Sequence, residues 1–478
     1  MLRDELIGRK REIERLDRCL NEERPQLIVV YGRRRVGKTF LINQYFRGRF
    51  DFKLTGLFQA KKEVQLRNFI NELNRQMKER HPVPENWQQA FELLREYLMS
   101  LPEDEKHVLF FDEMPWLNTQ KSDFLPSFEF FWNDYACTVK NLVLIVCGSA
   151  TAWMQKNIAR NKGGLFNRQT CSLFLKPFTL FETEAYLKSR DIDWSRYDIA
   201  ECYMILGGIP FYLSLLRADL SLSGNIDNLF FRKRAELWDE FDHLYQTLFS
   251  NSPQYIKTVE TLSGKRGGMT RTELAQRAGM HDNGSLTEVL DNLSVSDFIR
   301  PYSYYGRKTH ETRYRVSDYY SLFYFRFLKE YYGRDEQYWS HSSDNPSRRA
   351  WEGLTFELLC MDHIPQIKQK LGISGVLSDE STWFLKGGEG AEKGAQIDLL
   401  IDRRDQVINI CEIKFAMKEY EINKQYEELL RNKMEAFRST TGTKKTLQLT
   451  MITTYGIKMN KYSNRVSNQV LLDDLFAG

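Results

Sequence analysis

The sequence predicts an α/β protein whose N-terminal part is a doubly wound parallel sheet. Three short apolar segments, at 26–32, 107–113 and 141–149, lie between stretches with helical periodicity. They are rich in β-branched and aromatic residues, too short for buried helices and bounded by polar residues or glycine, which is typical of buried parallel strands. Helical patterns at 63–78 and 87–101 separate the strands, and this alternation indicates the doubly wound fold.

The remaining segments predict four further parts. Residues from about 180 to 250 contain no strand pattern and favour a helical lid. Three helix-like segments and a hairpin around Gly306 follow, a combination that predicts a winged helix. A polar, turn-rich linker comes next, and the last part alternates helices with strands at 395–404, 406–415 and 446–455. The predicted domains are the first α/β core at 1–185, the lid at 186–250, the winged helix at 251–332, the linker at 333–350 and a second α/β domain at 351–478.

The composition excludes several classes of protein. With 478 residues, 42% hydrophobic and 28% charged, the chain fits a globular protein of about three domains. A net charge of +4 is too small to indicate nucleic-acid binding by itself. The longest aliphatic run, 142–147, is far shorter than the ~18 residues of a membrane helix, so we expect no membrane partner. Seven cysteines without a CxxC pair and seven scattered histidines predict free thiols in a reducing cytoplasm and no zinc site.

A glycine-containing motif follows the first predicted strand. The segment GRRRVGKT at 32–39 fits G-x-x-x-x-G-K-[ST] and precedes a helical run, the context that makes this motif credible. The glycines let backbone N–H groups turn toward phosphates, and the helix N-terminus adds positive potential. Lys38 would neutralise the β- and γ-phosphates of ATP, and the Thr39 hydroxyl would bind Mg²⁺. The residues predicted to contact the nucleotide here are Gly32, Arg33, Arg34, Arg35, Val36, Gly37, Lys38, Thr39 and Phe40.

Two acidic residues end the second predicted strand. Asp112 and Glu113 lie at the carboxyl edge of the sheet, where open α/β folds bind ligands. We expect Asp112 to hold the metal ion through water and Glu113 to polarise the attacking water. Ser149, just after the third strand, is a candidate γ-phosphate sensor, and a hydrogen-bonded loop serine is the even alternative. Arg168 is the candidate arginine finger and Arg160 competes with it, while a plain surface arginine is an equal alternative for both.

A second group of charged residues interrupts the strands predicted near the C-terminus. Asp398 lies in GAQIDLLID, and Glu412 and Lys414 lie in INICEIKF. Residues two apart share a strand face, so Glu412 and Lys414 point the same way, and Asp398 can face them from a paired strand. Two carboxylates can hold Mg²⁺ and a lysine can orient water, as metal-assisted phosphodiester hydrolysis requires. Glu357 on the preceding helix is the fourth candidate and Glu352 the fallback; exposed charges on an edge strand are the structural alternative.

The predicted hairpin is basic and rich in tyrosine. It contains five basic residues, one acid and four tyrosines, namely Arg300, Arg307, Lys308, Arg313 and Arg315, Glu311, and Tyr302, Tyr304, Tyr305 and Tyr314. Such a hairpin can follow the phosphate backbone of DNA. Acidic residues on and next to the helix 285–296 argue against base readout in a major groove. Packing of this module as a lid or arm on the nucleotide domain is the equal alternative.

Together these motifs resemble the AAA+/STAND-type P-loop ATPases common in archaea and anaerobic bacteria. The resemblance rests on Gly8-Arg9-Lys10-x-Glu12, the phosphate loop, Asp112-Glu113, Gly148-Ser149, Arg168 with Lys176-Pro177-Phe178, and Gly207-Gly208-Ile209-Pro210. It implies that Arg9 and Pro210 line the adenine pocket. From the residues alone, Gly-Gly-Ile-Pro indicates only an interrupted helix.

The C-terminal part resembles the PD-(D/E)xK nuclease-like domain that is fused to such ATPases, which implies a restriction-endonuclease-like fold. Gln396 departs from the family's usual acidic residue two positions before the aspartate, so a degenerate, binding-only version stays open. Three functions follow. The first is an ATP-regulated, metal-dependent nuclease acting on DNA. The second is a STAND-like switch, in which nucleotide exchange changes assembly into homo-oligomers and the nuclease-like fold only binds a partner. The third is a DNA-remodelling or loading ATPase with a non-catalytic tail.

Overall fold

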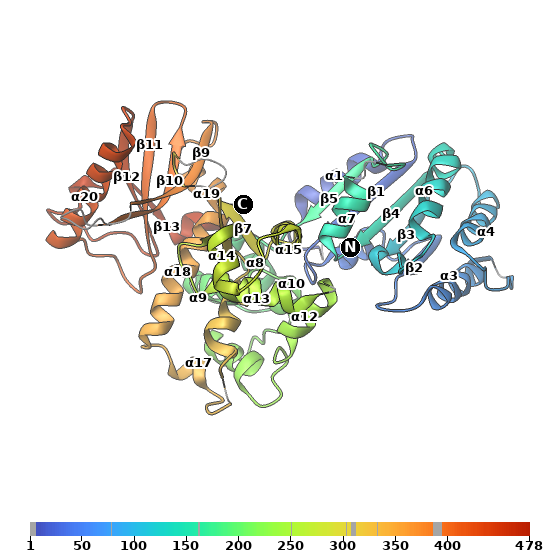
Figure 1. The fold of residues 1–478 in the computed structure, drawn as a ribbon, viewed down its shortest axis with the longest axis horizontal. Coiled ribbons are helices and arrows are strands. Elements are labelled where there is room, and N and C mark those ends of the chain that lie inside the picture. Colours follow the sequence, from blue (N-terminus) through green and yellow to red (C-terminus); the bar gives the residue numbers. More distant parts are fainter. Residues whose placement is uncertain are drawn as a thin grey trace. The chain divides into compact units, whose positions relative to one another are not determined.

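The chain folds into two compact units in the computed structural model (Figure 1). The N-terminal unit comprises Met1–Pro177 with the short returns Ile209–Phe211 and His243–Ser252, and the C-terminal unit comprises Phe178–Gly208, Tyr212–Asp242 and Pro253–Gly478. The structure describes residues 6–77, 79–160, 163–249, 251–302, 304–306, 312–331, 333–385 and 394–478.

The N-terminal unit is built on a five-stranded parallel sheet. Its strands are β1 (Gln26–Gly32), β2 (Phe52–Thr55), β3 (His107–Asp112), β4 (Leu142–Gly148) and β5 (Cys171–Leu175), in the order β2-β3-β4-β1-β5. All neighbours run parallel, which confirms the predicted α/β fold. The three predicted strands correspond to β1, β3 and β4, which are buried along their whole length. Sequence patterns miss the edge strands β2 and β5 because they are short and only partly buried.

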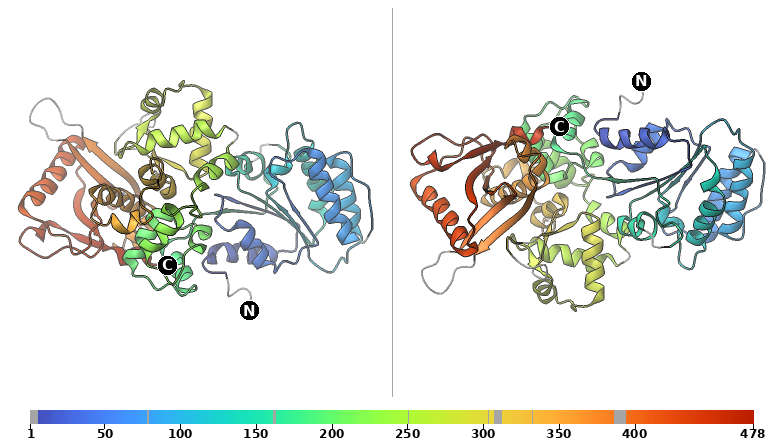
Figure 2. Two further views of the ribbon diagram at one scale, coloured as in Figure 1. Left: turned by 90° about the horizontal axis from the view of Figure 1, so that it is seen from below. Right: turned by 90° about the horizontal axis from the view of Figure 1, so that it is seen from above.

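Helices cover this sheet. α3 (Lys62–Met77), α4 (Trp87–Met99) and α6 (Phe124–Asp134) pack on one face through an aromatic-rich core that includes Phe69, Trp87 and Phe128. Figure 2 shows the sheet lying between the α3–α4 pair and α1 (Lys10–Leu20), which contacts β5. Shorter elements connect the strands: α2 (Lys38–Tyr45), α5 (Met114–Leu117), η2 (Ala136–Thr138), α7 (Thr151–Met154) and η3 (Gln155–Ala159).

Between residues 178 and 249 the described chain forms helices and no strand. The helices are α8 (Leu180–Lys188), α9 (Arg196–Leu206), α10 (Pro210–Ser214), α11 (Leu222–Ile226), η4 (Asp227–Phe231) and α12 (Glu240–Leu248). Thr179 and Glu182 form a capping box at the start of α8, and Gly207 ends α9 in the left-handed conformation. The helical character agrees with the sequence pattern, while its action as a lid stays a prediction.

A small module of three helices and a three-stranded sheet follows; we refer to the segment from α13 to β8 as the three-helix module. Its helices are α13 (Ser252–Ser263), α14 (Arg271–Ala278) and α15 (Gly284–Val295). The antiparallel strands β6 (Met269–Thr270), β7 (Ile299–Tyr302) and β8 (Arg313–Val316) pair in the order β6-β8-β7. Arg307, Lys308 and Glu311 of the predicted basic hairpin lie outside the described residues.

The predicted linker 333–350 forms packed structure in its described residues. After α16 (Tyr319–Phe323) and η6 (Tyr324–Leu328), it contains α17 (Tyr338–His341) and the start of α18 (Pro346–Asp362). The Trp339 side chain is fully buried. The stretch is rich in polar residues partly because they cap helices: the Asn345 side chain accepts a hydrogen bond from the first turn of α18. The described part of 333–350 is thus helical and packed, while the domain boundaries predicted around it stay a prediction.

The end of the chain forms a mixed five-stranded sheet. Its strands are β9 (Ser378–Leu385), β10 (Ala395–Arg403), β11 (Val407–Lys414), β12 (Thr446–Thr453) and β13 (Asn468–Leu471), in the order β13-β12-β11-β10-β9. β9, β10 and β11 pair antiparallel, whereas β11, β12 and β13 pair parallel. The remaining elements are α19 (Ile364–Lys370), α20 (Lys424–Thr441), η7 (Ser463–Arg465) and η8 (Leu472–Phe476). None of the helices in the described ranges combines the length and apolar character that a membrane crossing demands.

Candidate functional site

The phosphate loop connects the buried strand β1 to helix α2. Gly32 has a φ of 145°, and a Cβ there would collide with the carbonyl oxygen of Leu175 on the neighbouring strand. Gly37 has a φ of 89° and immediately precedes the first residue of α2. These positions therefore require glycine, and they bring Lys38 and Thr39 to the helix N-terminus, where the backbone favours an anion.

Lys38 is buried and turned into its own loop. Its Nζ donates to the carbonyl oxygens of Gly32 at 3.0 Å and Arg33 at 2.8 Å. Burial lowers the pKa of the Lys38 ammonium, against the opposing charges of Glu113 and Asp112. Nη1 of Arg34 is buried without a hydrogen-bond acceptor among the described residues. Cations held in this way fit a site that receives a polyphosphate.

The end of β3 lies beside the start of α2. The Thr39 hydroxyl donates to the Asp112 carboxylate, at 2.9 Å and 3.1 Å from its two oxygens, and Asp112 is buried. A hydroxyl and a carboxylate in contact form an oxygen donor pair that suits Mg²⁺. The structure thus brings together the two side chains that the sequence predicts as metal ligands.

Glu113 follows with a left-handed φ of 46°. Its Oε2 accepts hydrogen bonds from Ser149, at 3.1 Å from the backbone nitrogen and 2.8 Å from the hydroxyl oxygen. β3 and β4 are neighbours, so the residues that follow them meet at one edge of the sheet. Ser149 therefore holds the carboxylate of Glu113, a contact that the sequence analysis did not predict.

Residues far along the chain support the loop. The Arg9 guanidinium is buried and donates to the carbonyl oxygens of Val36 at 2.8 Å and Lys176 at 2.7 Å. The backbone N–H of Phe211 donates to the carbonyl of Arg35, and the Arg35 guanidinium carbon lies 4.1 Å from the centre of the Phe211 ring. Pro210, predicted to face the adenine, begins α10 and is half-buried, and its neighbour Phe211 makes the contact with the loop.

The other predicted nucleotide-site residues differ in exposure. Val36 and Arg33 are buried, whereas the Phe40 side chain is exposed. Arg168 and Arg160 are both exposed, and the described structure gives neither side chain a contact with the phosphate loop. The finger role of Arg168 therefore stays a prediction.

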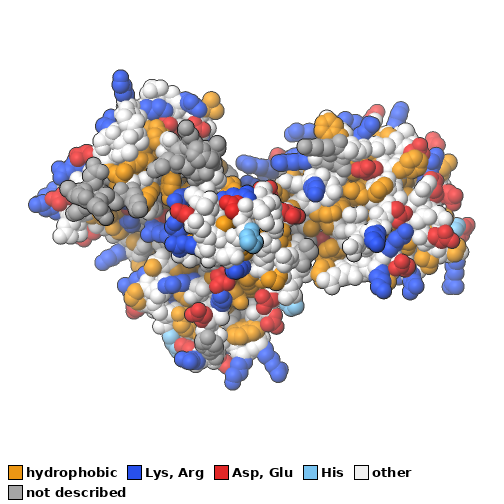
Figure 3. All heavy atoms as spheres, viewed as in Figure 1, with side chains coloured by type: hydrophobic (Ala, Val, Ile, Leu, Met, Phe, Trp, Pro, Cys, Tyr) orange, Lys and Arg blue, Asp and Glu red, His pale blue; other side chains and the backbone are white. Residues whose placement is uncertain are grey.

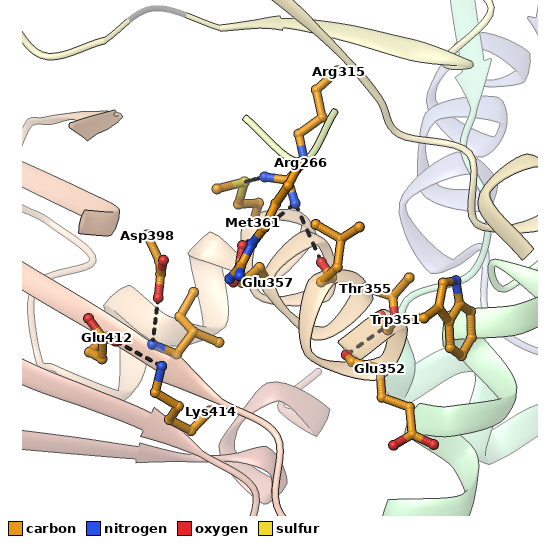
Figure 4. Close-up of polar contacts among 12 residues, drawn as sticks. Arg266, Arg315, Trp351, Glu352, Thr355, Glu357, Met361, Asp398, Glu412 and Lys414 are labelled. Atoms are coloured by element: carbon orange, nitrogen blue, oxygen red, sulfur yellow. Dashed lines mark hydrogen bonds and ion pairs between the residues drawn. The ribbon is translucent and has the colours of Figure 1, made fainter. Parts of the chain in front are cut away.

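In the C-terminal unit, the predicted carboxylates converge from three elements, as Figure 4 shows. Glu357 comes from α18, Asp398 from β10, and Glu412 with Lys414 from β11. The register of β10 against β9 shifts between Ile397 and Leu400, which places Asp398 in a bulge. Bulges re-aim side chains next to active sites, and Asp398 and Glu412 are both buried. We name Glu357, Asp398, Glu412 and Lys414 the carboxylate cluster.

Glu412 is the most heavily bonded member of the carboxylate cluster. Its Oε1 accepts from Lys414 at 2.8 Å and from the Tyr426 hydroxyl at 2.8 Å, and its Oε2 accepts from Lys433 at 2.7 Å. Tyr426 and Lys433, which both lie on α20, are not among the residues predicted from the sequence. Their spacing of seven residues, two helical turns, places both on one helix face and is the signal that could have found them.

The electrostatics of the two strand carboxylates differ. Burial, together with the charges of Glu412 and Glu357, raises the pKa of Asp398 to about 7. Burial would also raise the pKa of Glu412, but the charges of Lys414 and Lys433 outweigh it and lower that pKa. Glu412 is thus held ionised by lysines, whereas Asp398 accepts only the backbone N–H of Ile413, at 3.3 Å, among the described contacts.

Glu352 lies outside the carboxylate cluster. Glu352, the fallback for Glu357, points away from the cluster in Figure 4 and accepts from Arg348 at 2.9 Å. Within the described ranges, no group of three or more histidine, cysteine, aspartate or glutamate side chains is arranged to hold a metal ion. The predicted ligands Asp398 and Glu412 therefore form at most a two-carboxylate site in this arrangement.

The described basic residues of the predicted wing pair within the chain. Arg300 lies 2.7 Å from Asp362, Arg313 lies 3.0 Å from Glu273, and Arg315 lies 3.8 Å from Glu357. On the face shown in Figure 3, basic and acidic side chains are interspersed. These pairs speak against a hairpin whose described arginines are free to follow a phosphate backbone.

Comparison with known proteins assigns the N-terminal site to a class. Residues 6–216 match a family described as an ATPase domain predominantly from Archaea. This stretch contains the phosphate loop and the acidic pair after β3, and it is an ATPase domain of the P-loop type.

Individual relatives extend the comparison. The chain is 23% identical over 430 residues to the uncharacterized protein MJECL04 of Methanocaldococcus jannaschii, covering 89% of this chain and 91% of that protein. It is 49% identical over 43 residues to the uncharacterized ATP-binding protein MJ0423 of the same organism, covering 9% of this chain and 73% of that protein. A solved structure, the Walker-type ATPase PABY2304 of Pyrococcus abyssi, is similar with a TM-score of 0.49 at 18% identity, covering 68% of this chain and 97% of that one.

Proposed function

We propose that the N-terminal unit binds ATP with Mg²⁺ at the phosphate loop and hydrolyses it. The observation that carries this proposal is the contact of Thr39 with Asp112, because it joins the start of α2 to the end of β3. Thr39 and Asp112 would hold Mg²⁺, which when bound neutralises charge on the phosphates. Arg9 and Phe211 would fix the shape of the loop, and Pro210 is proposed near the adenine only by resemblance.

Two side chains would change partners during this reaction. Lys38 would leave the carbonyls of Gly32 and Arg33 for phosphate oxygens, which is favourable because a buried ammonium gains a charged acceptor. Glu113 would leave Ser149 and accept a hydrogen bond from the attacking water. Ser149 would then be free to contact the γ-phosphate, which is the sensor role predicted for it.

The test is a comparison of Lys38→Ala with wild type. We expect the loss of nucleotide binding, measured with a fluorescent ATP analogue. Phosphate release should fall by about a thousandfold or more, because the negative charge on the transferred phosphate loses the cation of Lys38. Lys140→Ala, an exposed lysine of the same unit, is the matched control and should behave as wild type. Undiminished ATP affinity in Lys38→Ala would contradict the phosphate-loop assignment.

For the C-terminal unit we propose metal-dependent phosphodiester cleavage, with DNA as the substrate. The supporting observation is that Glu357 on α18 and Asp398 and Glu412 on the strands are all buried, where charges are costly without partners, with Lys414 beside them. Asp398 and Glu412 would hold Mg²⁺, which supplies Lewis-acid stabilisation of the phosphate, and Lys414 would orient the water. The bulge at Asp398 is a further point in favour, since it aims this side chain toward its neighbours.

The cleavage test uses plasmid DNA with Mg²⁺ or Mn²⁺. Wild type is expected to nick or degrade the plasmid, and Asp398→Ala and Lys414→Ala are each expected to abolish this. Asp402→Ala is the matched control, because Asp402 lies on the same strand and pairs with Lys445 instead. Plasmid left equally intact by wild type and variants under several metals would contradict cleavage and favour the binding-only alternative.

A nucleotide-dependent switch that assembles into homo-oligomers is the competing function for the whole chain. DNA-stimulated ATP hydrolysis would favour the nuclease or the remodelling ATPase over the switch. The seven cysteines are free thiols, which is in keeping with the proposed cytoplasmic location.

A further inference from the structure

A single arginine from the three-helix module contacts the carboxylate cluster. Arg266 lies in the loop between α13 and β6, and its guanidinium donates to Oε1 of Glu357, as Figure 4 shows. The two residues are 91 positions apart in the sequence. The contact therefore joins two parts of the C-terminal unit that fold as separate elements.

The two partners differ in their freedom to move. The side chain of Glu357 is 4% exposed, whereas that of Arg266 is 57% exposed. Arg315 also lies 3.8 Å from Glu357 and is itself mostly buried, so Glu357 keeps a cationic neighbour when Arg266 leaves. Arg266 is thus the member of the pair that can leave without abandoning a buried charge.

The charge of Arg266 acts on the whole carboxylate cluster. Burial lowers the pKa of the Arg266 guanidinium, but the charges of Glu357, Asp398 and Glu412 outweigh this and raise it. All three carboxylates therefore act on the charge of the guanidinium, and its direct contact is with Glu357.

The loop that carries Arg266 is fixed to the three-helix module. Arg313 donates to the carbonyl of Gly268 at 2.9 Å, and Tyr302 donates to the carbonyl of Gly267. Gly268 has a φ of 61°, and a Cβ there would lie 2.6 Å from the carbonyl oxygen of Tyr314. The backbone position of Arg266 is therefore set by the fold of the three-helix module, and the part that can move is its half-exposed side chain.

We propose that Arg266 is a tethered counter-ion that closes the carboxylate cluster, and that a divalent cation binds there only when Arg266 leaves. The proposal rests on the function proposed for the C-terminal unit and adds its regulation. Two cations cannot share one set of carboxylates closely without repulsion. Withdrawal of the Arg266 side chain thereby opens the cluster, and the contact is autoinhibitory.

The experiment measures Mn²⁺ binding to the full-length protein without nucleotide, from the electron paramagnetic resonance signal of the free ion. We expect Arg266→Ala to bind Mn²⁺ at least about tenfold more tightly than wild type, the change expected when a neighbouring positive charge is removed. Arg266→Gln, which keeps hydrogen-bonding capacity and a similar size, should behave in the same way if charge is the cause. Arg277→Ala, an exposed arginine on α14, is the matched control and should equal wild type.

Adding Asp398→Asn to Arg266→Ala should remove the gained affinity, which assigns the ion to the carboxylate cluster. Equal Mn²⁺ affinity of wild type and Arg266→Ala would overturn the counter-ion while leaving the proposed metal site intact. No Mn²⁺ binding by any variant would overturn the metal site and the counter-ion together. Binding that survives Asp398→Asn would lie elsewhere and would also overturn the proposal.

Discussion

The phosphate loop and the carboxylate cluster both gather charged side chains at buried strands, but they hold these charges differently. At the loop, neutral groups hold each charge: backbone carbonyls accept from Lys38, and hydroxyls donate to Asp112 and Glu113. At the cluster, cations hold two of the three acids: Lys433 bonds to Glu412 and Arg266 to Glu357. A neutral partner can be exchanged for a ligand at little electrostatic cost, whereas a charged partner must be replaced by another charge.

The neutral partners at the phosphate loop are tested through Glu113. Glu113→Gln should lower ATP hydrolysis by about a hundredfold or more and keep ATP affinity, because the amide oxygen can still accept from Ser149 but cannot act as a base. Single-turnover phosphate release and equilibrium binding measure the two quantities. Glu105→Gln, exposed in the same unit, is the control. Loss of ATP affinity together with hydrolysis would assign Glu113 a structural part.

The charged partners at the carboxylate cluster are tested by Lys433→Met, which removes one cation from Glu412. We expect β11 to lose about 2 kcal/mol of protection against amide hydrogen exchange at neutral pH, since a buried carboxylate loses a direct partner. Exposed Lys424 on the same helix provides the control Lys424→Met. Unchanged amide hydrogen exchange of β11 in Lys433→Met would mean that Lys414 and Tyr426 alone stabilise the Glu412 carboxylate. The proposed difference between the two sites would then be weaker.

The part of each site that can be predicted from sequence is the part whose residues are adjacent in the chain. The phosphate loop and Asp112–Glu113 are short motifs next to fully buried strands. The sequence therefore predicts both the residues of this site and the edge of the sheet at which they meet. Tyr426, Lys433 and Arg266 reach the cluster from elements whose packing the sequence pattern does not specify. Gly-Gly-Ile-Pro marks an interrupted helix, yet the side chain that meets the loop is the next one, Phe211, which no motif includes.

The same limit applies to the fold. Fully apolar runs predict β1, β3 and β4, whereas the edge strands β2 and β5 are too short and too exposed to give a strong signal. Residues 333–350 have the composition of a linker, but Trp339 and Arg348 are buried there, and only the three-dimensional contacts reveal it. The wing prediction rests on the basic residues and tyrosines of the hairpin, and the structure pairs its described arginines with acids distant in sequence.

Glu201 is a buried carboxylate outside both sites, and it too has a charged partner. Burial raises the pKa of Glu201 to about 7, although Arg348 pairs with it. A raised folded-state pKa gives stability that is present below the unfolded value near 4.5 and is lost as pH rises through about 7. We expect wild type to lose about 2 kcal/mol more stability than Glu201→Gln between pH 5 and 7, measured by urea unfolding. The control is Glu236→Gln, at an exposed position; parallel pH profiles of wild type and Glu201→Gln would show that Arg348 keeps Glu201 ionised.

The smallest expected effect concerns the support of the phosphate loop. Phe211→Ala removes the ring beneath Arg35 and should weaken ATP binding by about threefold, as expected for one partly exposed cation–π contact. The backbone hydrogen bond from Phe211 to Arg35 would remain. Exposed Phe181 on α8, altered to Ala, is the control in the equilibrium binding assay. An affinity equal to wild type would mean that the backbone contact alone positions the loop.

The turn of the three-helix module also closes the C-terminal sheet. Tyr305 donates its backbone N–H to the carbonyl of Thr382 at 2.9 Å, so the turn continues the sheet beyond β9. A fragment cut at residue 351 would lose this cover and the first turn of α18. Its uncovered strand would then present unpaired N–H and C=O groups to other copies of the fragment, and self-association during expression would follow. Dissection of this protein should therefore keep the turn and the sheet on one polypeptide.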